Sequence, residues 1–175
     1  MKTRREFIVT TALGFGLAAV GARSETPAST AITTPEWKNP VKDFPERAPQ
    51  VEAGLAKRFV IAAHTDLAAV QEMLAVRPEL VNATWDWGKG DFESGLGAAS
   101  HMGRKDIAHY LLEHNARLDI FAAAMLDLYE VVKGALTAQP KLLDVPGPHG
   151  ISLLAHAKYG KAAQVLEFLG TFRSS

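Results

Sequence analysis

The residues with the clearest capacity for chemistry are six histidines and a group of acidic side chains near the middle of the chain. Histidine nitrogens bind Zn²⁺ and transfer protons near neutral pH. A zinc site on one helix needs two histidines four residues apart, a spacing that these histidines do not provide. The six are His64, His101, His109, His114, His149 and His156.

The acids Asp86, Asp91 and Glu93 do not follow the spacing of an EF-hand loop. We therefore predict no metal site and no cofactor. One alternative stays open, because His64, His101 and His156 each lie near the end of a predicted helix and would form a row if those helices stacked.

Motifs that support catalysis are missing. The chain has no Gly-x-Ser-x-Gly elbow, no phosphate-binding glycine loop and no dinucleotide fingerprint. Ser94 stands beside glycine but opens a predicted helix, where no strand presents a nucleophile. His149 lies in the turn Pro146-Gly147-Pro148-His149-Gly150, and a constrained, solvated loop explains it without catalysis. The sequence predicts that the protein is not an enzyme.

A loop at residues 83–93 combines aromatic, acidic and glycine residues. Exposed tryptophan is enriched in interface hot spots, which makes this loop a candidate contact with a partner. The alternative is that Trp85 and Trp87 fold back over an uneven junction of the fold. The partner-binding candidates are Trp85, Asp86, Trp87, Asp91, Phe92, Glu93 and His149.

Composition limits the possible partners and compartments. The 175 residues include 19 basic and 19 acidic ones and no cysteine. A neutral chain lacks the broad positive charge of a nucleic-acid-binding protein, so we expect no nucleic acid. Without cysteine, disulfides and thiolate chemistry are excluded, and the fold must depend on packing.

Residues 1–22 have the pattern of a signal peptide: a basic head, a short apolar stretch and a small-residue cleavage point near Ala22. The apolar stretch is too short to serve as a permanent membrane anchor. Arg4, Arg5 and Phe7 resemble the twin-arginine export motif, which implies a bacterial protein delivered to the periplasm. A general secretory signal is the alternative.

Residues 23–50 are rich in proline and read as an arm or linker. Trp37 and Phe44 are unusual in a free tether, and we expect them to dock the arm against the folded domain. That domain spans residues 51–172, and residues 173–175 form a short tail.

Within the domain, a helix-pair pattern recurs four times with unequal spacing. We place its turn at Thr65, Gly103, Asp127 and Gly160. Three residues before each turn stands a small side chain, which would let neighbouring helix pairs pack closely. Because each short amphipathic helix needs a neighbour to bury its apolar face, the repetition predicts a stacked solenoid.

The pattern resembles the ankyrin repeat, a unit of about 33 residues with a hairpin-like finger and two antiparallel helices. The resemblance is strongest from Gly103 to Leu112, whereas the Thr-Pro-Leu-His opening of the family survives only as Leu96 and Leu153. It implies an all-α solenoid whose concave face and fingers hold partners. The predicted helices span 52–63, 66–76, 94–102, 104–114, 120–126, 128–138, 152–159 and 161–171.

The predicted core comprises the apolar residues on the inner faces of these helices. They are Phe59, Leu67, Leu74, Leu96, Ile107, Leu111, Leu112, Phe121, Val132, Leu136, Leu153, Val165, Leu166 and Leu169. A further prediction is that Asp119 caps the start of the fifth helix.

Two functions follow from these patterns. The first is an exported, monomeric module that binds a periplasmic protein through its concave face and the loop 83–93. The alternative is a periplasmic ligand- or cofactor-binding protein, or an enzyme, with a site near the acidic loop and His149 or His156.

Overall fold

A computed structural model describes residues 48–172 of the chain. The predicted signal peptide with Arg4, Arg5 and Phe7, the arm up to residue 47 and the tail 173–175 lie outside the described residues.

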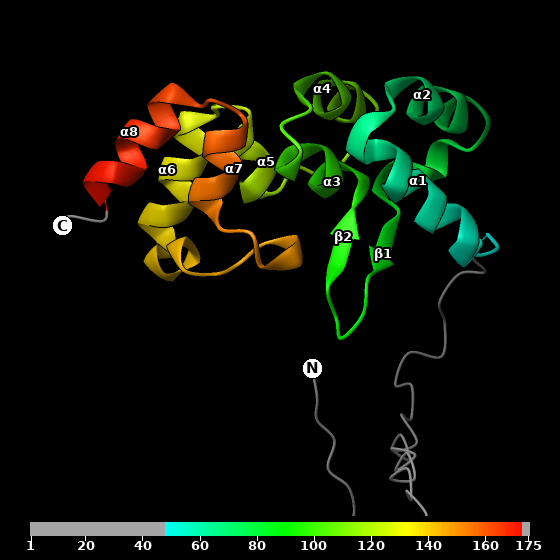
Figure 1. Cartoon of the computed structure of the whole chain (residues 1–175), viewed down its shortest axis with the longest axis horizontal. Helices are drawn as coiled ribbons and strands as arrows, with labels where there is room; N and C mark the ends of the chain where they lie inside the picture. The colour runs from blue at the N-terminus through cyan, green and yellow to red at the C-terminus, as the bar shows by residue number, and fades with distance from the viewer. Residues whose placement is uncertain (1–47, 173–175) are drawn as a thin grey trace, which may run out of the picture. The chain divides into compact units, whose positions relative to one another are not determined.

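The described part of the chain is mostly helical, as predicted, and its helices follow one another in four antiparallel pairs (Figure 1). All eight predicted helices are present, with ends that differ by at most two residues. They are α1 (Ala53–Thr65), α2 (Leu67–Val76), α3 (Gly95–His101), α4 (Lys105–Glu113), α5 (Ile120–Met125), α6 (Tyr129–Ala138), α7 (Leu153–Tyr159) and α8 (Ala163–Phe172).

Three short 3₁₀ helices fill the connections that follow α2 and α6. Two of them begin at a proline that ends the preceding helix, in agreement with the role that proline has in the sequence pattern. They are η1 (Pro78–Asn82), η2 (Pro140–Leu143) and η3 (Pro148–Gly150).

The loop 83–93 is a short β-hairpin within an otherwise helical fold, so the all-α fold class is confirmed. Strand β1 (Thr84–Asp86) pairs antiparallel with β2 (Phe92–Ser94), and Trp85 lies opposite Glu93. Three-residue strands within a glycine-rich loop carry too little alternation for sequence reasoning to detect. The hairpin extends from the helical body beside α1 and α3 (Figure 1).

Side-chain caps set the starts of four helices. Asp66, Ser94, Asp119 and Ser152 each accept a hydrogen bond from the backbone N–H three residues later. These oxygens satisfy donors that have no partner within the helix. The predicted cap at Asp119 is confirmed.

Left-handed backbone joins the helices within three of the pairs, at Gly103 (φ 66°), Asp127 (φ 62°) and Lys161 (φ 50°). The predicted turn position at Gly160 is therefore wrong by one residue. Gly160 is required for another reason: a Cβ there would lie 1.8 Å from the carbonyl oxygen of Met125. Its missing side chain lets the third and fourth pairs approach closely.

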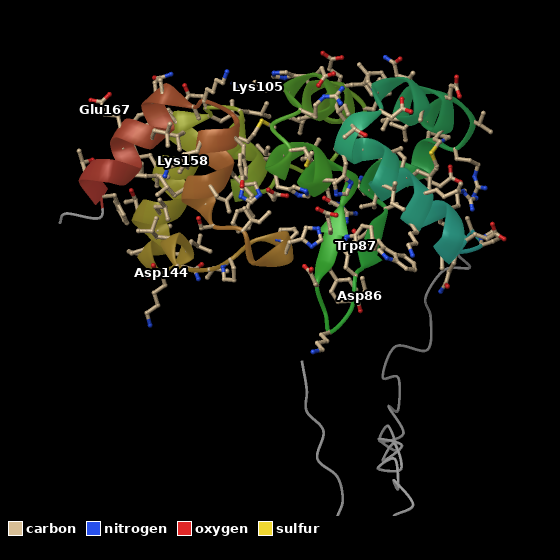
Figure 2. The ribbon with its side chains drawn as sticks, in the orientation of Figure 1. Asp86, Trp87, Lys105, Asp144, Lys158 and Glu167 are labelled. Carbon is tan, nitrogen blue, oxygen red and sulfur yellow. The ribbon has the colours of Figure 1, made fainter. Side chains whose placement is uncertain are left out.

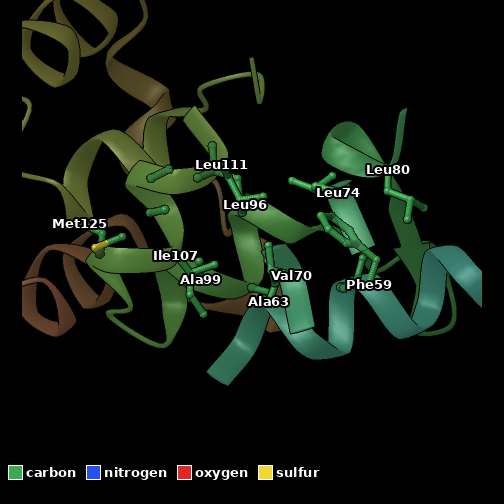
Figure 3. Close-up of a cluster of buried hydrophobic side chains, with 14 of the residues drawn as sticks. Phe59, Ala63, Val70, Leu74, Leu80, Leu96, Ala99, Ile107, Leu111 and Met125 are labelled. Atoms are coloured by element: carbon green, nitrogen blue, oxygen red, sulfur yellow. The ribbon is translucent and has the colours of Figure 1, made fainter. Parts of the chain in front are cut away.

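The first helices of the pairs stack in the order α1, α3, α5 and α7, and their contacts build two adjoining hydrophobic clusters. Phe59, Leu96 and Leu111 are central in the first cluster (Figure 3). Of the predicted core, ten residues are buried, and the four others are partly buried against the clusters. These four are Leu67, Leu112, Phe121 and Leu166.

Among the described residues, no helix has the length and apolar character needed to cross a membrane.

Candidate metal centre

Four potential metal ligands from four different elements meet at the base of the hairpin. His64 comes from the last turn of α1, Glu93 from β2, His101 from the end of α3 and His149 from η3. One ligand atom from each residue lies within 4.8 Å of the others. The fold therefore brings together side chains that are up to 85 positions apart in the sequence: α1 stacks on α3, and η3 adds His149.

The Glu93 carboxylate lies at the centre of this group and is completely buried. Three imidazoles and one indole form a closed ring of neighbours around it. The centroid distances are 5.0 Å from His64 to His101, 5.3 Å from His101 to His149, 5.9 Å from His149 to Trp87 and 6.3 Å from Trp87 to His64. A buried charge is costly unless it is paired, so this environment must supply positive charge or hydrogen-bond donors.

Two of the imidazoles are oriented by their outer nitrogens. His64 Nδ1 lies 2.9 Å from the carbonyl oxygen of Val60, and His149 Nδ1 lies 2.8 Å from Asp91 Oδ2. Because both oxygens only accept hydrogen bonds, each Nδ1 must carry the proton. The neutral form of either ring then directs an Nε2 lone pair inward, as in the histidine ligands of metal sites.

These inner nitrogens face Glu93. His64 Nε2 is 3.5 Å from Oε2, and His149 Nε2 is 3.3 Å from Oε1. His101 Nδ1 approaches Oε1 to 2.9 Å, and the side chain of His101 is only 9% exposed. Neither His101 Nδ1 nor Glu93 Oε1 has an aligned hydrogen-bond partner. Buried polar atoms are almost always satisfied, so this pair calls for an explanation.

The hydrogen bonds around Glu93 also affect its ionisation. Burial by itself raises the pKa of its carboxyl group, but the contact with His101, the Trp87 N–H and the charge that His64 carries when protonated outweigh burial. The pKa of Glu93 is therefore below its ordinary value, and the group is a carboxylate at neutral pH.

Asp91 supports the site from outside. Its Oδ1 accepts the backbone N–H of His149 at 2.9 Å, and Oδ2 accepts the ring Nδ1–H. The backbone of His149 is left-handed, with φ 57°. This conformation is uncommon for a residue other than glycine, and the two hydrogen bonds that His149 donates to Asp91 hold it.

Three imidazole nitrogens and one carboxylate oxygen form a donor set suited to a divalent transition metal. In a tetrahedral zinc site with bonds of about 2.0–2.1 Å, neighbouring donor atoms are roughly 3.3 Å apart. His101 Nδ1 and His149 Nε2 lie 2.9 and 3.3 Å from Glu93 Oε1, close to that value, whereas His64 Nε2 lies 3.5 Å from Oε2. All four ligand atoms lie within 4.8 Å of one another. The arrangement can therefore accept a metal ion after small side-chain movements.

The predicted partner-binding residues divide into two groups. Asp86, Trp87 and Phe92 have exposed surface on the hairpin, where Asp86 and Trp87 are labelled in Figure 2. Trp85 packs against the first hydrophobic cluster, with the Lys57 amine 5.1 Å from its ring. Trp85 therefore agrees with the alternative prediction, in which the tryptophan folds back against the domain.

The prediction that Glu93 contacts a protein partner needs correction, because its side chain is completely buried. His149 and Asp91 are committed to the same cluster. Sequence reasoning missed the meeting of His64 and His101 with Glu93, although the predicted row of histidines pointed to the first two. The third member of that row, His156, is buried against Phe121 and does not join the ligand set.

The prediction of no metal rested on ligand spacing along single helices. The cluster draws its ligands from separate elements, so that test did not apply to it. Its geometry favours a metal site. Comparison of the chain with protein-family models, with curated proteins and with solved structures found no match.

Proposed function

We propose that this protein binds one divalent transition-metal ion through His64, Glu93, His101 and His149. The observation that carries the proposal is the convergence of three imidazole nitrogens on the buried Glu93 carboxylate. Its closest contact joins His101 Nδ1 and Glu93 Oε1, which lie 2.9 Å apart without the alignment of a hydrogen bond. A cation among the four side chains would be coordinated by both of these atoms. It would also neutralise the buried carboxylate, which is the main electrostatic cost of the site.

The donor types restrict the metal. Imidazole suits Zn²⁺, Ni²⁺, Cu²⁺ and Fe²⁺, whereas Mg²⁺ and Ca²⁺ favour sites built from oxygen ligands. Four protein ligands also fill a tetrahedral coordination sphere, as in structural zinc sites, whereas catalytic zinc sites keep one position for water. We therefore propose a metal that holds the hairpin, α1, α3 and η3 together, in a protein that is not an enzyme.

The test is metal binding by the protein in its exported form, from residue 23 onward, after removal of bound ions with a chelator. Calorimetry and native mass spectrometry should show one Zn²⁺ per chain, with much weaker binding of Mg²⁺ and Ca²⁺. His149→Ala should weaken Zn²⁺ binding by more than the roughly 10- to 100-fold that loss of an outer partner costs.

His109→Ala and His114→Ala are matched controls, since both side chains are exposed on or just after α4 and lie outside the cluster. These variants should retain the wild-type affinity. No stoichiometric binding by the wild-type chain, or equal affinity in all three variants, would contradict the proposal.

A second candidate is binding of a protein partner by the outer side of the hairpin. Phe92 is 63% exposed and Trp87 is 37% exposed, although both are large apolar residues. Such residues on a protruding element are typical of interfaces. Phe92→Ala should abolish cross-linking to a periplasmic partner without lowering the melting temperature. An unchanged cross-linking pattern would argue against the hairpin as the contact.

The cellular setting remains a proposal from the sequence. We propose an ankyrin-like solenoid, because helix pairs joined by left-handed turns and one protruding hairpin are in keeping with that repeat. We also propose export to the periplasm, based on Arg4, Arg5 and Phe7. Replacing Arg4 and Arg5 by lysine should retain a fused reporter in the cytoplasm if the twin-arginine route is used.

A further inference from the structure

We propose that Trp87 sets the metal preference of this site by restricting Glu93 to a single coordinating oxygen. This inference rests on the proposed metal-binding function and concerns which ions the site favours. It starts from the unequal surroundings of the two carboxylate oxygens.

Glu93 Oε2 accepts a hydrogen bond from the indole N–H of Trp87 at 2.8 Å. Glu93 Oε1 has no hydrogen-bond partner and is the oxygen nearer to His101 Nδ1 and His149 Nε2, at 2.9 and 3.3 Å. The oxygen left for a metal is therefore Oε1. Bidentate binding would require Oε2 as well, and the indole N–H competes with a metal for the electron pairs of that oxygen. The hydrogen bond therefore makes Oε2 the weaker ligand of the two oxygens.

The position of the indole is fixed by the hairpin and by its aromatic neighbours. The backbone N–H of Trp87 donates to the carbonyl of Asp91 at 2.9 Å, directly beyond the strand pair. Its ring stands edge-on to His64 and is tilted against His149. Because two ligand histidines flank the ring, the indole cannot turn away from Glu93 without disturbing them.

One carboxylate oxygen and three nitrogens make four donors, which matches the four-coordinate preference of Zn²⁺ and tetrahedral Co²⁺. Larger ions such as Mn²⁺ and Cd²⁺ accept more donors, and a bidentate carboxylate is a common source of the additional one. The hydrogen bond from Trp87 makes Oε2 a poorer source of that fifth donor. The site should consequently favour small, four-coordinate ions beyond the preference that its ligand types alone impose.

The test uses Trp87→Phe, which removes the N–H donor and keeps an aromatic ring in the same place. Affinities for Zn²⁺ and Cd²⁺ are measured for the wild-type chain and for the variant. The preference for Zn²⁺ over Cd²⁺ should fall about tenfold or more, in the range typical of a lost outer hydrogen bond. Trp85→Phe, the same change in the same hairpin at a residue outside the cluster, should leave the preference unchanged.

Co²⁺ spectroscopy gives an independent readout that a merely structural role would not alter. The wild-type protein should show the intense visible bands of four-coordinate Co²⁺, and Trp87→Phe should shift toward the weak bands of higher coordination. A five- or six-coordinate spectrum in the wild-type protein overturns the inference even if the variant fails to fold.

The outcomes separate the inference from the proposed function. Zn²⁺ binding that depends on His149 but shows the same Zn²⁺ to Cd²⁺ preference in wild type and Trp87→Phe overturns the role of Trp87 alone. Absence of Zn²⁺ binding by the wild-type chain overturns both.

Discussion

Asp91 holds His149 by two hydrogen bonds across 58 positions of sequence, one to the backbone N–H and one to the ring Nδ1. The same carboxylate therefore fixes the left-handed backbone of η3 and the direction of the imidazole. The backbone N–H of His149 is the largest influence on Asp91 and lowers the pKa of its carboxyl group, so Asp91 is charged at neutral pH. A charged partner on the outer nitrogen makes the inner nitrogen a better metal ligand.

Asp91→Asn should weaken Zn²⁺ binding by about 10- to 100-fold, because an amide supports the histidine less well than a carboxylate. Isothermal calorimetry on the purified chain measures this. Asp86→Asn is the matched control, since Asp86 is exposed on the same hairpin and its carboxylate accepts the Gly88 N–H, away from the ligand cluster. Equal affinities in the two variants would remove Asp91 from the site.

Metal should stabilise the folded domain. A ligand that binds only the native state at 100 times its dissociation constant adds about 2.7 kcal/mol to the free energy of unfolding. The melting temperature should therefore rise by several degrees with Zn²⁺ and return to its starting value with a chelator. In His149→Ala the same Zn²⁺ concentration should produce little change, whereas an undiminished rise there would indicate binding elsewhere.

Two glycine-to-alanine substitutions should act in opposite directions. Gly160→Ala places a Cβ 1.8 Å from a backbone oxygen of Met125, and it should destabilise the domain by more than the about 1–3 kcal/mol typical of overpacking. Gly134→Ala meets no atom within 4 Å in the middle of α6 and should stabilise the domain by roughly 0.5–1 kcal/mol. Denaturant unfolding gives both values. Similar stabilities for the two variants would contradict the close approach at Gly160.

His156 should make the domain sensitive to mild acid. Burial lowers the pKa of this imidazole below its ordinary 6.5, and this effect outweighs the hydrogen bond to the Ser152 carbonyl, which raises it. A histidine with a lowered pKa in the folded state takes up a proton more readily when unfolded. Its contribution to stability is therefore complete above pH 6.5 and declines as the pH falls below that value.

The check is the free energy of unfolding between pH 7.5 and 5.5 for the metal-free wild-type chain and for His156→Gln. The variant should lose less stability than the wild type across this interval. His109→Gln, at an exposed position on α4, should follow the wild-type curve. Parallel curves for wild type and His156→Gln would show that this imidazole does not govern the response to acid.

Helices were predictable because their signals are local. The run from Gly103 to Leu112 has a left-handed glycine followed by apolar residues at helical spacing, and α4 forms there with Ile107 and Leu111 buried. Asp119 was likewise predicted as the N-cap of α5, and its side chain accepts the Ala122 N–H. The strands β1 and β2 escaped detection, because their pairing depends on partners across a turn and each contains only three residues.

The ligand cluster could not be predicted from local sequence patterns. Nothing near Glu93 in the sequence indicates that it is buried, because the side chains that surround it come from α1, α3 and η3. Successive side chains of a strand point to opposite faces, so Glu93 lies on the inner face when Phe92 is exposed. That reasoning was open only to a reader who had recognised the strand. A row containing His64 and His101 was an alternative prediction from the sequence. Whether these two side chains meet depended on the stacking of the first helices.

The sequence by itself determined the helix pairs, their apolar faces and most of the core, because helix propensity, capping and apolar periodicity act over a few residues. Only the tertiary structure decided that the hairpin turns Glu93 inward and that η3 delivers His149 to it. Those contacts depend on how successive helix pairs pack, which is set by distant side chains and by close approaches such as Gly160 on Met125. The candidate metal site therefore exists only because the stacked helix pairs bring its four ligands together.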